Sequence, residues 1–295
     1  MKHHRKGRKI IHKWVQVLIV CLLVFFFMMP LALTAANSFM SQAEISGNYG
    51  MIFSGNGMSY VAETVNLKWI PDMVTGSQYV TVLLKSVTYL KKFWNSVFLV
   101  VPITIFQMAA ACLTAYGFTR TKGRSTQILF FAYVIVLLMP YQVTSVPNYM
   151  VANWLNLKDS YWAIWLPGIF SPFSVYLLTK YMKRVPKSII ESAQIDGAGE
   201  RQIFRYMMLP MCKGQIYSCM ILVFIDYWNM VEQPLILLRD TEKYPLSVFL
   251  SKIQADNIGI AFAASVIYMI PVLLLYLYGE DYVLEGIASQ SEIKG

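Results

Sequence analysis

Six long apolar stretches follow one another along the chain, and charged residues gather between them. Each stretch is long enough, as a helix, to cross the hydrocarbon core of a bilayer, which takes about 20 apolar residues. The pattern therefore predicts an all-α membrane protein with six transmembrane helices. Their expected ranges are 14–38, 94–118, 126–149, 160–182, 214–238 and 258–279.

The first stretch follows a basic segment, residues 1–13. A basic segment before an apolar run also begins secretory signal peptides. Here, however, the apolar run is too long for such a peptide, and Thr34-Ala35-Ala36 is a poor cleavage site. We therefore expect an uncleaved first span.

Composition supports a membrane protein, because 57% of the residues are hydrophobic and only 14% are charged. The formal net charge of +9 could indicate nucleic-acid binding, but the basic residues flank the apolar stretches. If both termini and the segments 120–124 and 180–213 are cytoplasmic, 17 of the 25 Lys and Arg residues lie in the cytoplasm, as the positive-inside rule requires. We predict cytoplasmic termini, a lipid bilayer as surroundings and no nucleic-acid partner.

Groups for catalysis or metal binding are sparse. The apolar stretches contain no His, the four cysteines form no CxxC or Cys/His cluster, and no P-loop is present. The loops also leave no room for a globular catalytic domain. We expect neither an enzyme nor a disulfide, a catalytic site, a metal site or a bound cofactor.

One polar segment, residues 186–213, stands between the fourth and fifth stretches. Its centre, Asp196-Gly197-Ala198, is a turn signal in which Gly197 can adopt positive φ. Ser188 is a candidate N-cap for a first short helix. A second helix is indicated by apolar residues at helical spacing, namely Ile203, Phe204, Met207 and Met208. The segment predicts a helix–turn–helix that offers a docking surface at the membrane face.

The same segment resembles the EAA motif of ABC importer permeases, the cytoplasmic loop that couples the permease to its ATPase. The residues that carry the resemblance, or lie within the motif, are Glu191, Ser192, Ala193, Asp196, Gly197, Ala198, Arg201, Phe204 and Pro210. Further matches occur in the expected order at Asn95-Ser96, 115–120, 139–144, Pro186, Trp228-Asn229, Pro234-Leu235 and 285–295. Together they cover roughly residues 10–295 and are most similar to carbohydrate importers of the maltose type.

The resemblance implies a set of partners. A second permease subunit, expected to be a different chain, would complete the pathway, and an ABC ATPase dimer would bind ATP and Mg beneath it. An extracytoplasmic solute-binding protein would deliver a sugar. A loop that is merely solvated is the alternative for segment 186–213.

Three departures from the family pattern affect these expectations. Ser192 replaces an Ala, and Gly214 stands where a Pro often closes the motif. The tail, residues 285–295, also departs from the family's usual ending. A contact of Lys294 and Gly295 with the ATPase is therefore an open expectation.

Asp226 and Glu232 are the only acidic residues within a predicted span. Acids within a membrane usually face the bundle interior or a wet cavity. Asp226, Asn229 and Gln233 share one helical face, and with Trp228 they are candidates to line a sugar pathway. Hydrogen bonding between helices is an equally good explanation of this face.

Three other functions remain to be weighed. A transporter driven by an ion gradient would need charged or broken-helix sites at the midplane. An intramembrane enzyme would need a catalytic pair in the spans. An ABC permease for a non-sugar solute would share the EAA core, and is the nearest alternative.

Overall fold

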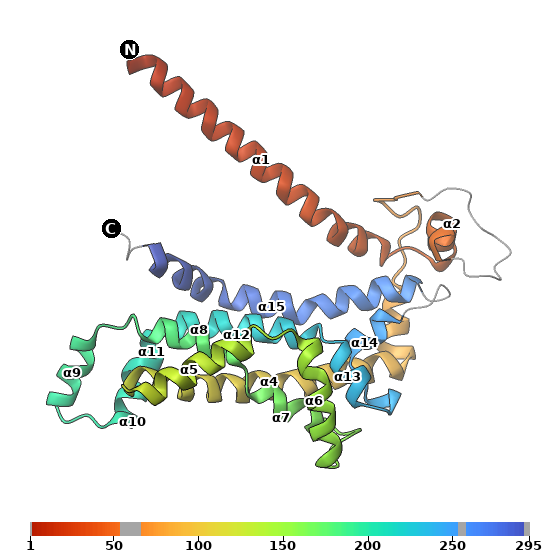
Figure 1. Cartoon of the computed structure of the whole chain (residues 1–295). Helices are drawn as coiled ribbons and strands as arrows, with labels where there is room; N and C mark the ends of the chain where they lie inside the picture. The colour runs from red at the N-terminus through yellow and green to blue at the C-terminus, as the bar shows by residue number, and fades with distance from the viewer. Residues whose placement is uncertain (1, 54–65, 253–257, 292–295) are drawn as a thin grey trace. The chain divides into compact units, whose positions relative to one another are not determined.

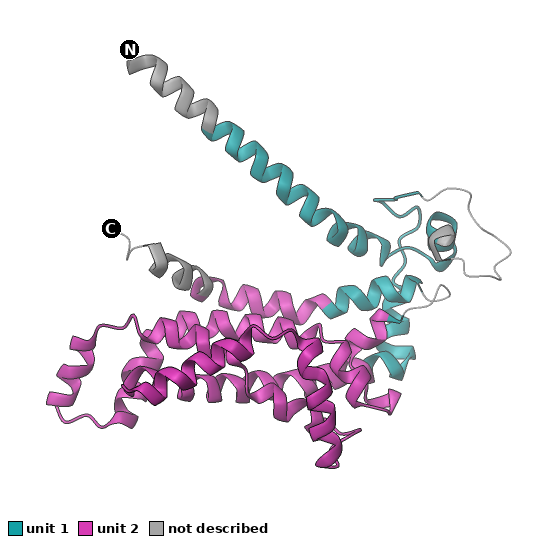
Figure 2. Ribbon diagram, viewed as in Figure 1, with its two compact units in different colours: residues 1–90, 252–268 teal, residues 91–251, 269–295 magenta. Residues whose placement is uncertain are grey.

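The computed structural model describes residues 2–53, 66–252 and 258–291. Within these ranges every regular element is a helix (Figure 1). The chain forms two compact units, shown in Figure 2, which are residues 1–90 with 252–268 and residues 91–251 with 269–295.

Unit 1 begins with α1 (Lys2–Asn37), followed by α2 (Gln42–Phe53) and by a short α3 (Ser77–Val80) that continues as a π-helical turn (Thr81–Lys85). Its small core consists of Met40, Ile45, Tyr49 and Ile258, with Phe262 packed against them. From Lys13 onward α1 is apolar enough to cross a membrane, and most of its side chains are exposed. Lipid or a partner chain is therefore the natural surrounding of this helix.

Unit 2 contains most of the helical bundle. Its elements are α4 (Val87–Arg120, from Lys91 onward), α5 (Arg124–Leu137), α6 (Tyr141–Trp154), α7 (Trp162–Ile169), α8 (Pro172–Met182), α9 (Lys187–Ile195), α10 (Glu200–Ile203), a π-helical turn (Phe204–Met208), α11 (Leu209–Met211), α12 (Lys213–Trp228), α13 (Glu232–Leu237), a 3-10 turn (Thr241–Lys243), α14 (Leu246–Ser251) and the later part of α15 (Ile258–Ser291). Figure 1 shows α9 and α10 at one end of this unit and α13 and α14 at the other.

The core of unit 2 lies where α4, α8 and α12 meet. Small residues such as Ala111, Ala115 and Cys219 are fully buried there, which lets the helix backbones approach closely. A buried hydrogen bond joins α4 to α8 in this core, because Gln107 Nε2 donates to Ser174 Oγ over 2.8 Å. Helix packing in this core thus follows the small-residue pattern of membrane bundles.

Four helical segments within the described residues are long and apolar enough to span a membrane, and the number rises to six if two bent helix pairs each count as one span. The predicted all-helical membrane protein is therefore confirmed, with four to six candidate spans. The four segments correspond to the first, second, fourth and sixth predicted stretches.

Two predicted spans differ from the structure. The stretch 126–149 was expected to be one span that its prolines could kink, but α5 ends at Leu137 and α6 begins at Tyr141 with a bend of 104° between them. The stretch 214–238 was also expected to be continuous, whereas α12 ends at Trp228 and α13 starts only at Glu232. Proline lacks the backbone N–H that a continuing helix needs, which accounts for the first break.

The structure extends helices into both segments that were expected to be tails. Helix α1 already begins at Lys2, inside the predicted basic tail, and α15 continues to Ser291, well into the predicted C-terminal tail. Lys294 and Gly295 lie outside the described residues.

Candidate functional site

The polar segment 186–213 folds as two short helices, α9 and α10, around a tight turn. Gly197 has a φ of +84°, and its neighbour Ala198 donates its backbone N–H to Ala193 O over 2.9 Å. This geometry closes the C-terminus of α9 and favours glycine, because side chains with a Cβ are strained at positive φ. The predicted helix–turn–helix and the conformation of Gly197 are confirmed.

The predicted N-cap of α9 was wrong. The helix begins at Lys187, with Pro186 rather than Ser188 at the N-cap position and no side-chain cap. Proline ahead of the first turn starts the helix through its fixed φ instead of through a hydroxyl bond.

One face of the segment is anchored in unit 2, and the other is free within this chain. Ile190, Ala193 and Ile203 are buried in the main core, and the Phe204 ring packs on Tyr116 with centroids 5.0 Å apart. Ile195, by contrast, is 86% exposed immediately before the turn. The segment is therefore a fixed projection with an apolar side chain at its tip.

An ion pair joins the segment to the end of α4. Arg120 donates from Nη2 to Glu200 Oε1 over 2.6 Å and from Nε to Glu200 Oε2 over 3.0 Å, and Tyr116 Oη also donates to this carboxylate. Gln194 adds a hydrogen bond from α9. The sequence analysis did not single out Glu200, although its partners Tyr116 and Arg120 belong to the quoted motif 115–120. The available signal was Arg120, a basic residue at the end of a span and before a polar segment.

The other charged residues singled out in the segment lie elsewhere. Glu191, Asp196 and Arg201 are exposed, and so are Ser192 and Pro210. The Ser192 hydroxyl donates to Ile189 O, as expected for a serine on a helix surface. None of these exposed residues takes part in the Arg120–Glu200 ion pair.

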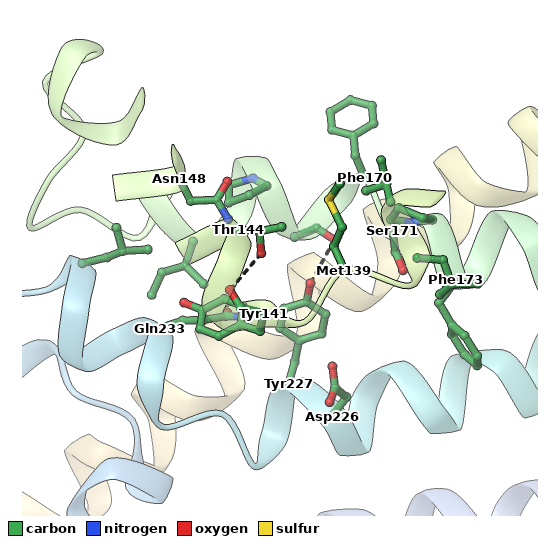
Figure 3. A pocket seen from close by; sticks show the side chains of 17 residues that line it. Met139, Tyr141, Thr144, Asn148, Phe170, Ser171, Phe173, Asp226, Tyr227 and Gln233 are labelled. Atoms are coloured by element: carbon green, nitrogen blue, oxygen red, sulfur yellow. Dashed lines mark hydrogen bonds between the residues drawn. The ribbon is translucent and has the colours of Figure 1, made fainter. Parts of the chain in front are cut away.

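A cavity of about 410 Å³ lies within unit 2 (Figure 3). It lies where three helix breaks meet, between α5 and α6, between α7 and α8, and between α12 and α13. Irregular backbone at membrane depth is tolerated where it lines a water-filled cavity. Its polar lining residues include Thr144, Asn148, Ser171, Asp226 and Gln233.

A second cavity of about 560 Å³ adjoins the first and shares Tyr141, Asp226, Tyr227 and Gln233 with it. Asn229 and Glu232 belong to the second cavity alone. We refer to the two together as the midchain cavity.

The structure brings most of the predicted pathway residues together, but not on one face of a single helix, as the sequence analysis expected. Asp226, Asn229 and Gln233 all line the midchain cavity, although they do not share one helix, because α12 ends before Gln233. Trp228 lines neither part of it. Its side chain is 1% exposed and stacks on Phe224 with centroids 5.3 Å apart.

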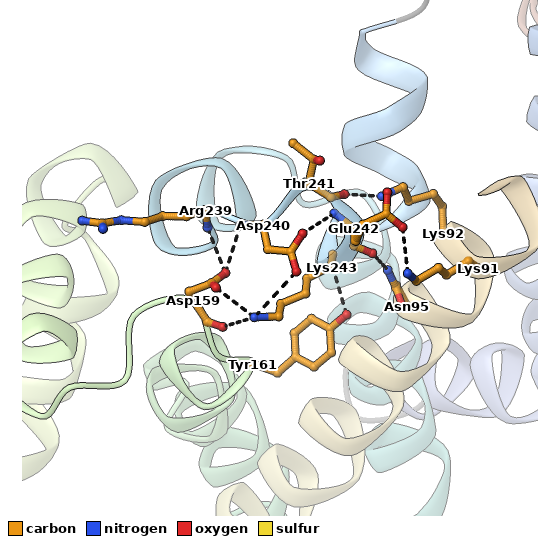
Figure 4. Close-up of polar contacts among 10 residues, drawn as sticks. All are labelled: Lys91, Lys92, Asn95, Asp159, Tyr161, Arg239, Asp240, Thr241, Glu242 and Lys243. Carbon is orange, nitrogen blue, oxygen red and sulfur yellow. Dashed lines mark hydrogen bonds and ion pairs between the residues drawn. The ribbon is translucent and has the colours of Figure 1, made fainter.

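A polar cluster fixes the loop between α13 and α14 (Figure 4). Asp159 Oδ1 accepts backbone N–H bonds from Arg239 and Asp240, and Lys243 Nζ donates to Asp159 Oδ2 over 2.9 Å. These bonds, first that of the Asp240 N–H and then that of Lys243, lower the pKa of Asp159 to about 2. The loop is therefore held by one carboxylate, which no sequence motif indicated.

The same loop is tied to the start of α4. Lys91 forms a 2.7 Å ion pair with Glu242, and Lys92 donates to Thr241 O. Asn95, part of a motif quoted from the sequence, donates to Glu242 O over 2.7 Å and to Tyr244 O over 3.1 Å. Asn95 thus has a structural partner within the chain.

Comparison with known proteins identifies relatives of similar size. The arabinooligosaccharides transport system permease protein AraQ of Bacillus subtilis is 28% identical over 226 residues, which cover 76% of this chain and 80% of AraQ. The polygalacturonan/rhamnogalacturonan transport system permease protein YtcP of Bacillus subtilis is 29% identical over 255 residues, which cover 80% of this chain and 88% of YtcP.

A solved structure has the same fold. One chain of a bacterial ABC transporter involved in the import of the acidic polysaccharide alginate superposes with a TM-score of 0.75 at 20% identity, covering 92% of this chain and 96% of that chain. The family model described as binding-protein-dependent transport system inner membrane component matches residues 107–284. The protein thus belongs to this family, the multi-pass inner-membrane permease subunits of ABC importers, and is not itself an enzyme.

Proposed function

We propose that this chain is one of two permease subunits of a sugar importer, docked through segment 186–213 on an ATPase that binds ATP and Mg. Both termini and this segment face the cytoplasm, and the loop between α13 and α14 faces outward. A solute-binding protein delivers the sugar. The oligosaccharides named for AraQ and YtcP support a saccharide substrate.

The observation that carries this proposal is the exposed apolar tip of an otherwise anchored segment. Ile195 projects beside the positive-φ turn at Gly197, while Ile190 and Ala193 bury the opposite face. A segment that is anchored through one buried face while it holds a large apolar side chain out on the other supports a protein partner over a solvated loop. In this proposal the positive-φ turn at Gly197 sets the shape that fits the ATPase surface.

Movement of the ATPase reaches the bundle by two contacts in this proposal. The Phe204 ring bears on Tyr116, and the Glu200 carboxylate holds Arg120, both near the end of α4. A displaced α9–α10 pair therefore pulls directly on α4. Alternating access follows when the bundle moves as a rigid body around the docking site.

The midchain cavity is the part of the pathway that this chain contributes. Asp226, Asn229 and Gln233 offer hydrogen bonds, and Tyr141 and Tyr227 offer aromatic surface. The second permease subunit, a different chain, closes the pathway, and the exposed faces of the bundle leave room for it. A contact of Lys294 and Gly295 with the ATPase is part of the same proposal.

The test is uptake of radiolabelled sugars by the intact importer in liposomes, with and without ATP. Gly197→Ala is the informative variant, because positive φ strains an alanine by about 1 kcal/mol or more. Gly199→Ala is the matched control, since the added Cβ would meet only Gln202 Oε1 at 3.9 Å and φ there is −74°.

We expect ATP-dependent uptake of one sugar, lost in Gly197→Ala and retained in Gly199→Ala. Uptake without ATP, or equal uptake in both variants, would contradict the coupling role of the segment. ATP-dependent uptake of a non-sugar solute alone would replace the sugar by that solute and keep the coupling mechanism.

A further inference from the structure

We infer that the midchain cavity selects its substrate by charge: it admits neutral or cationic saccharides and rejects uronate-containing, anionic ones. This inference rests on the proposed function, because it takes the cavity as part of the sugar pathway. It concerns the substrate class, on which the relatives disagree. AraQ is named for arabinooligosaccharides, which are neutral, whereas YtcP is named for polygalacturonan, a polymer of an acidic sugar.

The ionisable groups of the cavity lining that can carry charge at neutral pH are all acidic. Its lining contains two carboxylates, those of Asp226 and Glu232, and no Lys, Arg or His. No ion pair to either carboxylate is found among the described residues. Lys and Arg of unit 2 instead lie at its two ends, for example Arg120 beside Glu200 and Lys243 beside Asp159. The cavity therefore holds two acids with no cationic partner, so any charge that its lining carries is negative.

The remaining polar groups of the lining are neutral and suit hydroxyl groups. Thr144, Asn148 and Gln233 carry hydroxyl or amide groups, and Tyr141 and Tyr227 add aromatic faces. Figure 3 shows Gln233, Tyr141, Tyr227 and Asp226 gathered on one side of the cavity. A carboxylate is a strong acceptor for sugar hydroxyl donors, so both acids favour a neutral saccharide.

A uronate would be repelled by the same two acids. Its own carboxylate would pass within several ångström of Asp226 or Glu232, and like charges repel more strongly in a partly desolvated cavity than in bulk water. An anionic polymer needs cationic partners along its path, as phosphate and carboxylate sites usually provide through Arg. The described lining offers none.

The first experiment measures the potential of the cavity without any sugar. In the assembled importer with Cys21→Ser, which removes the exposed native thiol, Thr144→Cys places a reporter thiol in the lining. Its rates of reaction with a cationic and an anionic methanethiosulfonate are compared. Each rate is divided by the rate of the same reagent with a free thiol in solution.

We expect the cationic reagent to be favoured at least about fivefold. Asp226→Asn combined with Glu232→Gln should remove this preference, since a unit charge several ångström away acts with opposite sign on the two reagents. Glu242→Gln is the matched control, because this acid pairs with Lys91 outside the lining. A ratio near one, or a ratio that the double variant leaves unchanged, would overturn the inference.

The second experiment compares ATP-dependent uptake of neutral oligosaccharides with that of oligogalacturonates and oligoalginates by the same assembly. We expect uptake only among neutral or amino sugars. Uptake of an oligouronate at a rate comparable to a neutral sugar would overturn the inference and leave the proposed function standing. Absence of ATP-dependent uptake for every saccharide would refute the proposed sugar importer, whereas the thiol labelling ratio would still report the cavity charge.

Discussion

Arg120, at the last residue of α4, holds Glu200, at the first residue of α10, through two hydrogen bonds of 2.6 and 3.0 Å. The side chains are 27% and 54% exposed, so the pair contributes at most about 1 kcal/mol to folding stability. Its geometry matters more than its energy, because a bidentate guanidinium–carboxylate pair fixes both distance and orientation. The pair is thus suited to transmit a movement of α10 to α4.

Loss of this pair is expected to uncouple the importer more than it destabilises the chain. Glu200→Gln keeps the shape of the side chain but removes the charge, so ATP hydrolysis should continue while sugar uptake per ATP falls severalfold. The melting temperature in detergent should shift by no more than a few degrees. The ratio of uptake to hydrolysis in liposomes is the measurement.

Two further variants sharpen that test. Arg120→Lys keeps the charge without the bidentate geometry and should give an intermediate ratio. Exchanging the partners, Arg120→Glu with Glu200→Arg, should restore part of the coupling. A normal ratio in Glu200→Gln would show that the ion pair has no role in transmission.

Close helix packing at the midchain cavity depends on Gly168 of α7. A Cβ at this position would lie 3.2 Å from both Ile103 Cγ2 and Tyr227 Oη, so Gly168→Ala must displace a neighbour. Overpacking of this kind costs about 1–3 kcal/mol. Gly117→Ala is the control, because a Cβ there meets nothing within 4 Å and alanine favours a helix by up to about 1 kcal/mol.

Thermal unfolding of the purified variants in detergent measures this difference. We expect a lower melting temperature for Gly168→Ala and an equal or higher one for Gly117→Ala. Equal destabilisation of the two would contradict the close approach of α7 to Ile103 and Tyr227.

The membrane fold and the coupling segment could be predicted because their signals are local. Apolar length indicates a span, and Asp196-Gly197-Ala198 is a turn signal that needs no knowledge of the tertiary structure. The turn at Gly197 was therefore predicted correctly. The N-cap of α9 was not, because both Pro186 and Ser188 are residue types that begin helices, and the structure has Pro186 at the N-cap position.

The midchain cavity and the ion pairs are different, because they join residues far apart in the sequence. Pro140 alone indicates neither a bend as large as 104° nor that residues of α7 and α12 line a cavity beside it. Gln233 and Asp226 line the same cavity from the two sides of a helix break and not from one helix. Glu200 was missed because its partner lies 80 residues earlier in the chain.

The proposed orientation predicts which loops are reachable from each side of the membrane. With Cys21→Ser as background, Asp196→Cys should react with an impermeant maleimide only in inside-out vesicles. Arg239→Cys, in the loop between α13 and α14, should react only in intact right-side-out cells. The positive-inside distribution of Lys and Arg is the physical reason for this expectation. The reverse pattern would invert the proposed topology and remove segment 186–213 from the ATPase.

Acid should loosen the loop that Asp159 holds. Because the folded-state pKa of Asp159 is about 2, below the value of about 4 for an unfolded chain, the folded state binds fewer protons between these values. Its stabilising effect is complete above about pH 4 and is lost as the pH falls toward 2. Asp159→Asn, which can still adopt the residue's positive φ of 60°, should be less stable than the original chain at pH 5.

The difference in melting temperature between the two chains should then shrink steadily from pH 4 to pH 2, because protonated Asp159 no longer attracts Lys243. Glu191→Gln, an exposed acid in segment 186–213 away from this cluster, corrects for the general effect of acid on the bundle. A difference that stays constant over this range would mean that the backbone hydrogen bonds to Asp159 act through shape alone. In that case the charge of the carboxylate would not be what holds residues 239–243 in place.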